Sequence, residues 1–183
     1  MFDVTTFVTA CRDAIKDVDP RSRIRSLLGE ALTRSEGIRE VLNAPSYEGR
    51  LEDRVLFHSP HLTIMKTIFA PRTVSPPHDH RAWAAIAVYE GQEVNVLYRR
   101  SLSGLTEFQT VRSKAPSLLV LDESTIHAVR NPLGSPSRAL HVYLGDLLDL
   151  VARPRSMWEP HTVRGVPYDF ALFAKWESQS LER

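Results

Sequence analysis

The fold is decided by the stretch Pro76-Pro77-His78-Asp79-His80-Arg81-Ala82-Trp83-Ala84-Ala85-Ile86-Ala87-Val88-Tyr89-Glu90-Gly91. Side chains alternate between the two faces of a strand, so a strand over this stretch places His78 and His80 on one face and Asp79 on the other. Apolar residues continue as far as Gly91, where we expect a turn. Two imidazoles on one face of a rigid strand provide half of a metal site.

A third histidine follows at some distance along the chain. His127 lies 36 residues beyond Gly91 and begins the run His127-Ala128-Val129-Arg130-Asn131. Three neutral imidazoles suit zinc, copper, iron or nickel. We therefore expect His78, His80 and His127 to hold one transition-metal ion. The competing interpretation is a barrel that keeps these histidines in a hydrogen-bonded core without metal.

The composition is that of an ordinary globular protein and argues against several classes of function. The chain has 183 residues, of which 43% are hydrophobic and 25% charged, and its formal net charge is +1. This charge gives no electrostatic reason to expect nucleic acid or an anionic membrane as a partner. Cys11 is the only cysteine, which excludes an internal disulfide and fits a reducing, cytoplasmic environment. The N-terminus does not resemble a signal peptide, and no stretch approaches the roughly 18 apolar residues of a membrane span.

The periodicity of apolar residues predicts a single domain over residues 1–183, with a helical N-terminal part (1–45), a β-barrel (50–150) and a C-terminal extension (151–183). Apolar residues at three- and four-residue spacing predict helices within 4–15, 20–32 and 35–42. We expect these helices to cap one end of the barrel. A further helix is expected over about 169–178.

The barrel itself is predicted from a change of period. From about residue 54 the apolar residues alternate, and about eight short strands separated by close turns follow, which is typical of a small antiparallel barrel or jelly roll. The continuous apolar run at 117–121 predicts a strand that is buried on both faces.

The two histidine motifs resemble the two-part sequence pattern of the cupin barrels, in which His-x-His precedes a glycine and His-x-x-x-Asn follows. The resemblance implies a mainly β fold, the cupin double-stranded β-helix or jelly-roll barrel, here with N-terminal helices and a short C-terminal helix. Most cupins carry a glutamate ligand four residues after the second histidine, and Ala84 occupies that position. The site would therefore keep the full charge of a divalent metal and favour an anionic, chelating substrate.

A three-histidine cupin without this glutamate resembles the cysteine dioxygenase family of thiol dioxygenases, including the bacterial mercaptopropionate dioxygenases. The run His78-Asp79-His80-Arg81 followed by Trp83 is similar to the bacterial branch, and Ala139-Leu140-His141-Val142-Tyr143 resembles that family's Ser-x-His-x-Tyr strand. The resemblance implies that His141 and Tyr143 lie beside the metal, where such groups orient substrate and tune proton transfer. An alanine replaces the serine of that strand, so we expect a shortened relay.

The resemblance also implies a reaction and a cofactor. Iron(II) would be held by the three histidines, and a small thiol acid and dioxygen would react there to give a sulfinic acid. Zinc and nickel are other divalent ions that the site would accept. We expect Trp83, Ile86 and Tyr98 to form apolar walls around the substrate.

An arginine anchors the substrate carboxylate in that family. Arg54 is the best match, because a guanidinium binds a carboxylate through two parallel hydrogen bonds. Arg81, Arg99 and Arg100 are competitors for this role, although each fits a solvated position at the edge of the barrel better.

Two other functions stay open from the sequence. One is a metal-dependent cupin enzyme that acts on a substrate without a thiol, and the other is a non-catalytic, ligand-binding cupin that consumes no oxygen. The sequence also leaves open whether the chain forms a homo-oligomer. Animal members of the resembling family join the tyrosine to a cysteine, whereas the only cysteine here is Cys11 in the first expected helix. We therefore expect Tyr143 to be unmodified.

Overall fold

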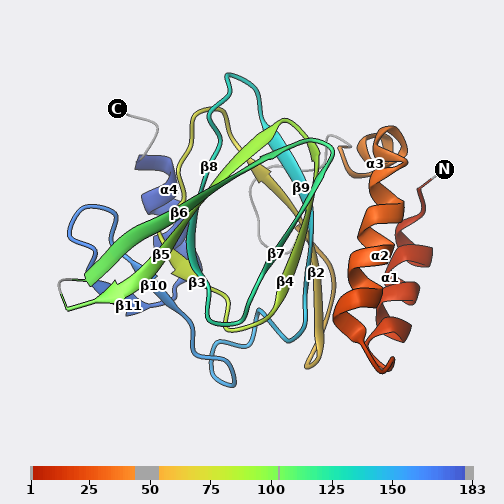
Figure 1. The fold of residues 1–183 in the computed structure, drawn as a ribbon, viewed down its shortest axis with the longest axis horizontal. Helices are drawn as coiled ribbons and strands as arrows, with labels where there is room; N and C mark the ends of the chain where they lie inside the picture. Colours follow the sequence, from red (N-terminus) through yellow and green to blue (C-terminus); the bar gives the residue numbers. More distant parts are fainter. Residues whose placement is uncertain (1, 44–53, 103, 180–183) are drawn as a thin grey trace.

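Two antiparallel sheets form a barrel in the computed structural model, which describes residues 2–43, 54–102 and 104–179 (Figure 1). In spatial order, the five-stranded sheet consists of β1 (Val55–Ser59), β2 (Leu62–Phe69), β9 (Ser137–Tyr143), β4 (Ala84–Glu90) and β7 (Ser117–Leu121). The six-stranded sheet consists of β11 (Gly165–Pro167), β10 (Ser156–Trp158), β3 (His78–Asp79), β8 (Ile126–Arg130), β5 (Gln92–Ser101) and β6 (Gly104–Lys114). The chain passes back and forth between the sheets, which confirms the mainly β jelly-roll fold.

Three helices precede the barrel at the predicted positions. They are α1 (Val4–Ala14), α2 (Pro20–Leu32) and α3 (Ser35–Leu42). Asp3 caps α1 by accepting a hydrogen bond from the backbone nitrogen of Thr6 at 2.6 Å, and Asp19 caps α2 in the same way through Ser22 at 3.1 Å. These local signals explain why the bounds of the helices can be read from the sequence.

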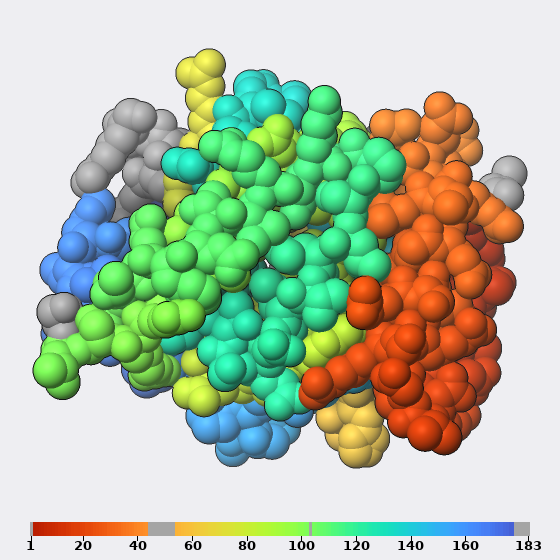
Figure 2. All heavy atoms as spheres, viewed as in Figure 1, coloured from red at the N-terminus to blue at the C-terminus, as the bar shows by residue number. Residues whose placement is uncertain are grey.

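The three helices cover the outer face of the five-stranded sheet (Figures 1 and 2). Their apolar stripes form one core cluster with the outward-facing residues of β2, β4 and β9, and Leu28 and Ile38 are completely buried in it. The expectation that they cap an end of the barrel is therefore wrong. They cover a face instead, because that face is itself apolar and must be removed from water.

Strands β4 and β9, in the middle of the five-stranded sheet, are buried on both faces. Ala85 and Ala87 face the helices, whereas Ile86 and Val88 belong to the inner cluster of the barrel. The strand over 117–121 is half-buried at the edge of its sheet, so the prediction that it is buried on both faces is wrong. Cys11 lies in the outer cluster, outside the barrel as expected.

The histidine stretch is not one continuous strand. It is divided into β3 and β4, and the intervening segment contains Arg81 with a φ of 51°. This left-handed residue is unusual for a side chain larger than glycine. It turns the chain from the six-stranded sheet to the five-stranded sheet, so His78 lies on β3 while His80 follows it.

The C-terminal extension packs on the side of the barrel opposite the N-terminal helices (Figure 1). Strand β10 pairs with β3 through Met157 and His78, and β11 pairs with β10. Helix α4 (Phe170–Gln179) follows and begins one residue after the predicted position. None of the described helices is both long enough and apolar enough to span a bilayer.

Candidate metal centre and adjoining cavity

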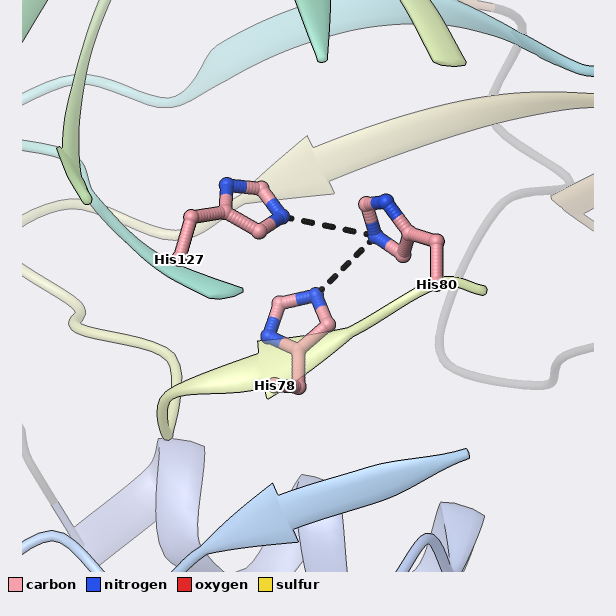
Figure 3. Close-up of side chains that lie close together, drawn as sticks. All are labelled: His78, His80 and His127. Carbon is pink, nitrogen blue, oxygen red and sulfur yellow. Dashed lines mark hydrogen bonds between the residues drawn. The ribbon is translucent and has the colours of Figure 1, made fainter. Parts of the chain in front are cut away.

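Three buried histidines meet inside the barrel. His78 on β3 is the cross-strand partner of His127 on β8, and His80 follows β3. The Nε2 atom of His80 is 3.2 Å from that of His78 and 3.4 Å from that of His127 (Figure 3). All three ligand atoms lie within 4.8 Å of one another. Imidazole nitrogens bound to one metal at about 2.0–2.1 Å are roughly 3–3.4 Å apart, so the two measured separations fit a single ion.

Hydrogen bonds at the opposite ring nitrogens orient two of these imidazoles. The Nδ1 atom of His78 lies 2.9 Å from the carbonyl oxygen of Pro76, and that of His127 lies 2.8 Å from Oδ1 of Asn95. Both oxygens accept, so both Nδ1 atoms carry the proton and both Nε2 atoms present a lone pair. Nε2 of His80 carries at most one hydrogen, so it can donate to the lone pair of either His78 or His127 but not to both. A cation at the centre satisfies all three nitrogens, which is how metal-ligating histidines are held in proteins.

The three imidazoles are neutral at neutral pH. Burial lowers the pKa of His78 to about 4 and holds the pKa values of His80 and His127 well below the usual range. At neutral pH these rings therefore gain no extra proton that could separate the facing lone pairs. Neutral imidazole is also the form that binds a metal.

No carboxylate belongs to this group of ligands in the part of the chain that the structure describes. Ala84, at the position of the usual cupin glutamate, lies opposite Tyr143 in the register of β4 and β9. The ring of Tyr143 packs near-perpendicular to that of His80, with 4.9 Å between their centroids. The position next to the histidines that holds a ligand in most cupins is thus paired with a phenol here.

A chain of hydrogen bonds runs from Tyr143 across the barrel wall. The hydroxyl of Tyr143 lies 2.7 Å from Nδ1 of His141, and Nε2 of His141 lies 2.8 Å from Oγ1 of Thr67. Burial lowers the pKa of His141 to about 3, so its ring is neutral, and burial raises the pKa of Tyr143 above its usual value. The expectation of a shortened relay is wrong, because Thr67 on the neighbouring strand β2 supplies the hydroxyl that Ala139 lacks.

A cavity of about 350 Å³ adjoins the histidines. Its walls are mostly apolar and include Met65 and Phe69 of β2, Leu147 of the segment after β9, and Phe170 and Phe173 of the C-terminal extension. Volumes of roughly 300–1,000 Å³ are typical of small-molecule sites.

The residues expected as walls lie elsewhere. Trp83 is buried in the outer core beneath the N-terminal helices, and Ile86 belongs to the inner cluster of the barrel. The hydroxyl of Tyr98 points toward Glu107, 3.4 Å away on the hairpin of β5 and β6. None of the three lines the cavity, because the break after β3 and the added C-terminal segment change which elements border the metal site.

Of the four arginines considered from the sequence, only Arg54 lines the cavity. Arg81 and Arg100 pair with the buried Asp79 at 2.9 and 3.7 Å, and Arg99 stacks over Phe108 on the hairpin. Arg54 interacts electrostatically with Glu177 of α4, whose pKa is raised by burial and partly restored by this cation.

Arg155 also lines the cavity, and sequence reasoning missed it. Its side chain is buried, with 4% of its surface exposed, and its guanidinium lies 3.9 Å from the ring centre of Tyr168. One Nη2 hydrogen bond goes to the carbonyl of Leu147 at 2.9 Å, while Nε is buried without a partner. A buried cation with an unused donor is expected to bind an anion. No sequence motif surrounds Arg155, and only the pairing of β10 with β3 brings it to the site.

Comparison with known proteins finds no matching family model and no matching curated sequence. Among solved structures, an oxalate oxidase in complex with glycolate is 22% identical, covers 46% of this chain and 42% of its own, and has a TM-score of 0.40. The cupin domain of Cnp3 from Schizosaccharomyces pombe is 13% identical over 54% of this chain and 63% of its own, with a TM-score of 0.43. BH2720 from Bacillus halodurans is 16% identical over 59% of this chain and 77% of its own, with a TM-score of 0.49. This chain thus spans less than half of the oxalate oxidase chain.

Proposed function

We propose that this protein is a metal-dependent dioxygenase that oxidises a small thiol acid to a sulfinic acid at the three-histidine site. The observation that carries the proposal is the convergence of three Nε2 atoms beside a cavity that also contains the buried, incompletely hydrogen-bonded Arg155. A thiolate suits the metal, and a carboxylate suits the arginine. One small molecule bearing both groups would satisfy the two features together.

Iron(II) held by His78, His80 and His127 would supply the oxidation chemistry, in which both atoms of dioxygen pass to the sulfur. Because the three imidazoles are neutral, they leave the charge of a divalent ion uncompensated. The protein therefore favours a substrate that arrives as an anion. The apolar cavity walls strengthen this preference, since charges attract more strongly where water is excluded.

Arg155 is the better placed of the two candidate carboxylate anchors. Its unused Nε–H and its remaining guanidinium donors offer the fork that a carboxylate needs. Arg54 is already engaged with Glu177 at the cavity wall. Arg155 is also fixed, because its guanidinium stacks on Tyr168 and one of its nitrogens is hydrogen-bonded. Such preorganisation lowers the cost of binding.

The chain of Thr67, His141 and Tyr143 positions a proton at the cavity. When Thr67 donates to Nε2 of His141, the Nδ1 proton of the imidazole points to the oxygen of Tyr143. The hydroxyl hydrogen of Tyr143 is then free to donate to a bound ligand. In the opposite polarity the hydroxyl of Thr67 donates to the carbonyl oxygen of Ala139 at 3.4 Å, Nε2–H of His141 donates to Thr67, and Tyr143 donates to Nδ1 of His141. The two polarities therefore differ in whether Tyr143 has a hydrogen left to donate to the substrate.

The test is oxidation of small thiols by protein reconstituted with iron(II). Oxygen consumption is measured against a panel of thiol acids and matched acids without sulfur, and the sulfinic acid is identified by mass spectrometry. His78→Ala, His80→Ala and His127→Ala should lose most of the bound metal in elemental analysis. Reconstituted wild type that holds no transition metal, or that holds iron but oxidises no thiol in the panel, would contradict the proposal.

A pair of conservative variants separates the two arginines. Arg155→Lys should raise KM about tenfold to a hundredfold, because a lysine lacks the bidentate fork and a charge-assisted hydrogen bond contributes about 1.5–3 kcal/mol. Arg54→Lys serves as the matched comparison, with a smaller rise. The reverse order of effects would place the carboxylate at Arg54.

A further inference from the structure

The cavity extends beyond the groups that a small thiol acid would contact. One of its walls is helix α4, which contributes Phe170, Phe173 and Glu177. Glu177 follows Phe170 by seven positions, which corresponds to about 10 Å along the helix axis. A small thiol acid held between the histidines and Arg155 would leave much of this wall in contact with water.

The aromatic side chains of this wall form one preorganised cluster. The ring of Tyr168 lies 5.1 Å from that of Phe170 and 5.5 Å from that of Phe173. Phe173 also packs edge-on against the ring of His78, with 5.0 Å between centroids and an angle of 90°. The guanidinium of Arg155 stacks on Tyr168. The aromatic wall is thus attached to both the metal ligand and the candidate anchor, so its distance from the reacting group is fixed.

Apolar residues outside α4 also line the cavity. Met65 and Phe69 of β2 line it together with Leu147, and all three are buried. Ala171 and Ala174 of α4 line the cavity and are exposed to solvent. The cavity is therefore open to solvent at these two positions, where the helix carries only small side chains. Space of this kind favours an apolar substituent, because moving such a group from water into an apolar site is favourable.

We propose that the substrate of this site is a thiol acid that carries an apolar group, aromatic or branched alkyl, which lies against Phe173 and Phe170 under helix α4. The inference rests on the proposed thiol oxidation for the choice of the thiol and the carboxylate. The apolar group itself is inferred from the wall and the volume of the cavity. It makes the aromatic cluster a determinant of specificity.

Binding can be measured separately from turnover. Anaerobic calorimetry of the iron(II)-loaded full chain compares mercaptopropionate with mercaptopropionate that carries a benzyl substituent on the carbon next to the carboxylate. We expect the dissociation constant of the benzyl compound to be at least about tenfold lower, since a single methylene in an apolar pocket already contributes tenfold or more. Equal dissociation constants, weaker binding of the benzyl compound, or no binding of either thiol would overturn the inference.

Variants of α4 test the location of the apolar group. Ala174→Phe fills the space beside the wall, so the preference for the benzyl compound should fall to less than about threefold. Ala171→Phe provides a second filling variant if the first does not fold. Lys175→Phe places the same ring on an exposed position of the same helix that does not line the cavity, and it should keep the preference. An unchanged preference in a folded Ala174→Phe or Ala171→Phe variant would overturn the inference.

Product analysis distinguishes this inference from the proposed function. If mercaptopropionate is converted to its sulfinic acid but the benzyl compound binds no more tightly, the dioxygenase proposal stands and the proposed binding site for the apolar group is refuted. If the benzyl compound binds at least tenfold more tightly but neither thiol is oxidised, the proposed binding site stands and thiol oxidation is refuted.

Discussion

Glu93 allows a test of the structure that does not depend on any substrate. Its side chain lies on β5 with no exposed surface, Oε1 accepts a hydrogen bond from Ser137 at 3.5 Å, and Oε2 has no partner. Burial raises the pKa of this carboxyl to about 7 from an ordinary value of 4.5. At a pH between 4.5 and 7, Glu93 is protonated in the folded protein and ionised in the unfolded chain. The contribution of this group to the free energy of unfolding is therefore complete below about pH 4.5 and is lost as the pH rises toward 7.

Replacing Glu93 by glutamine removes this titration and keeps the shape of the side chain. The pKa difference corresponds to a loss of about 3 kcal/mol in the free energy of unfolding once Glu93 is ionised in both the folded and the unfolded state. Relative to wild type, the free energy of unfolding of Glu93→Gln should therefore rise by about 3 kcal/mol between about pH 4 and about pH 8. Urea denaturation of both proteins, each freed of metal with a chelator, measures the difference between their free energies of unfolding at each pH. The contributions of the other titrating groups are common to both proteins and cancel in this difference. Parallel pH profiles of wild type and variant would show that Glu93 is ionised in the folded protein and that the reasoning is wrong.

The remaining predictions concern the phenol, the cysteine and the outer core. Tyr143→Phe should slow thiol oxidation about tenfold to a hundredfold without loss of bound metal, as measured by initial rates and elemental analysis, and Thr67→Val should slow it in the same direction. Intact-mass spectrometry before and after turnover should show no loss of two hydrogens, whereas a loss that disappears in Cys11→Ser would reveal a crosslink. Leu28→Ala should lower the free energy of unfolding by about 2–5 kcal/mol in urea while the metal content stays the same, because Leu28 is completely buried in the outer core and does not line the cavity.

Features that depend on neighbouring residues could be predicted from the sequence. Helix α3 was placed at its observed bounds, and Pro20 begins α2 as expected, because caps and apolar spacing are local signals. The histidine triad was also predictable, since the spacing of His78 and His80 and the later position of His127 are visible without knowledge of the fold. The structure brings these three side chains together.

Features that depend on distant residues were missed. An apolar run cannot reveal whether a strand lies in the middle or at the edge of a sheet, which is why the prediction that residues 117–121 are buried on both faces is wrong. The break after β3 was hidden because the alternation of His78, Asp79 and His80 leads directly into the apolar run that follows Arg81. Thr67 is 74 residues from His141 in the sequence, and nothing near either residue indicates that they are hydrogen-bonded.

The C-terminal extension explains why substrate binding is harder to infer from sequence than metal binding. Met157 of this segment pairs with His78, and Phe173 packs on the same imidazole. Arg155, which precedes β10, is therefore held near the candidate metal ligands by backbone pairing, and Phe173 by its ring contact with His78, rather than by a motif. A barrel of this type can keep its three histidines while a different extension supplies other walls and another anchor. Under the proposed function, the cupin-like pattern therefore reports the metal site, whereas Arg155 and the aromatic wall come from residues 151–179, to which that pattern does not extend.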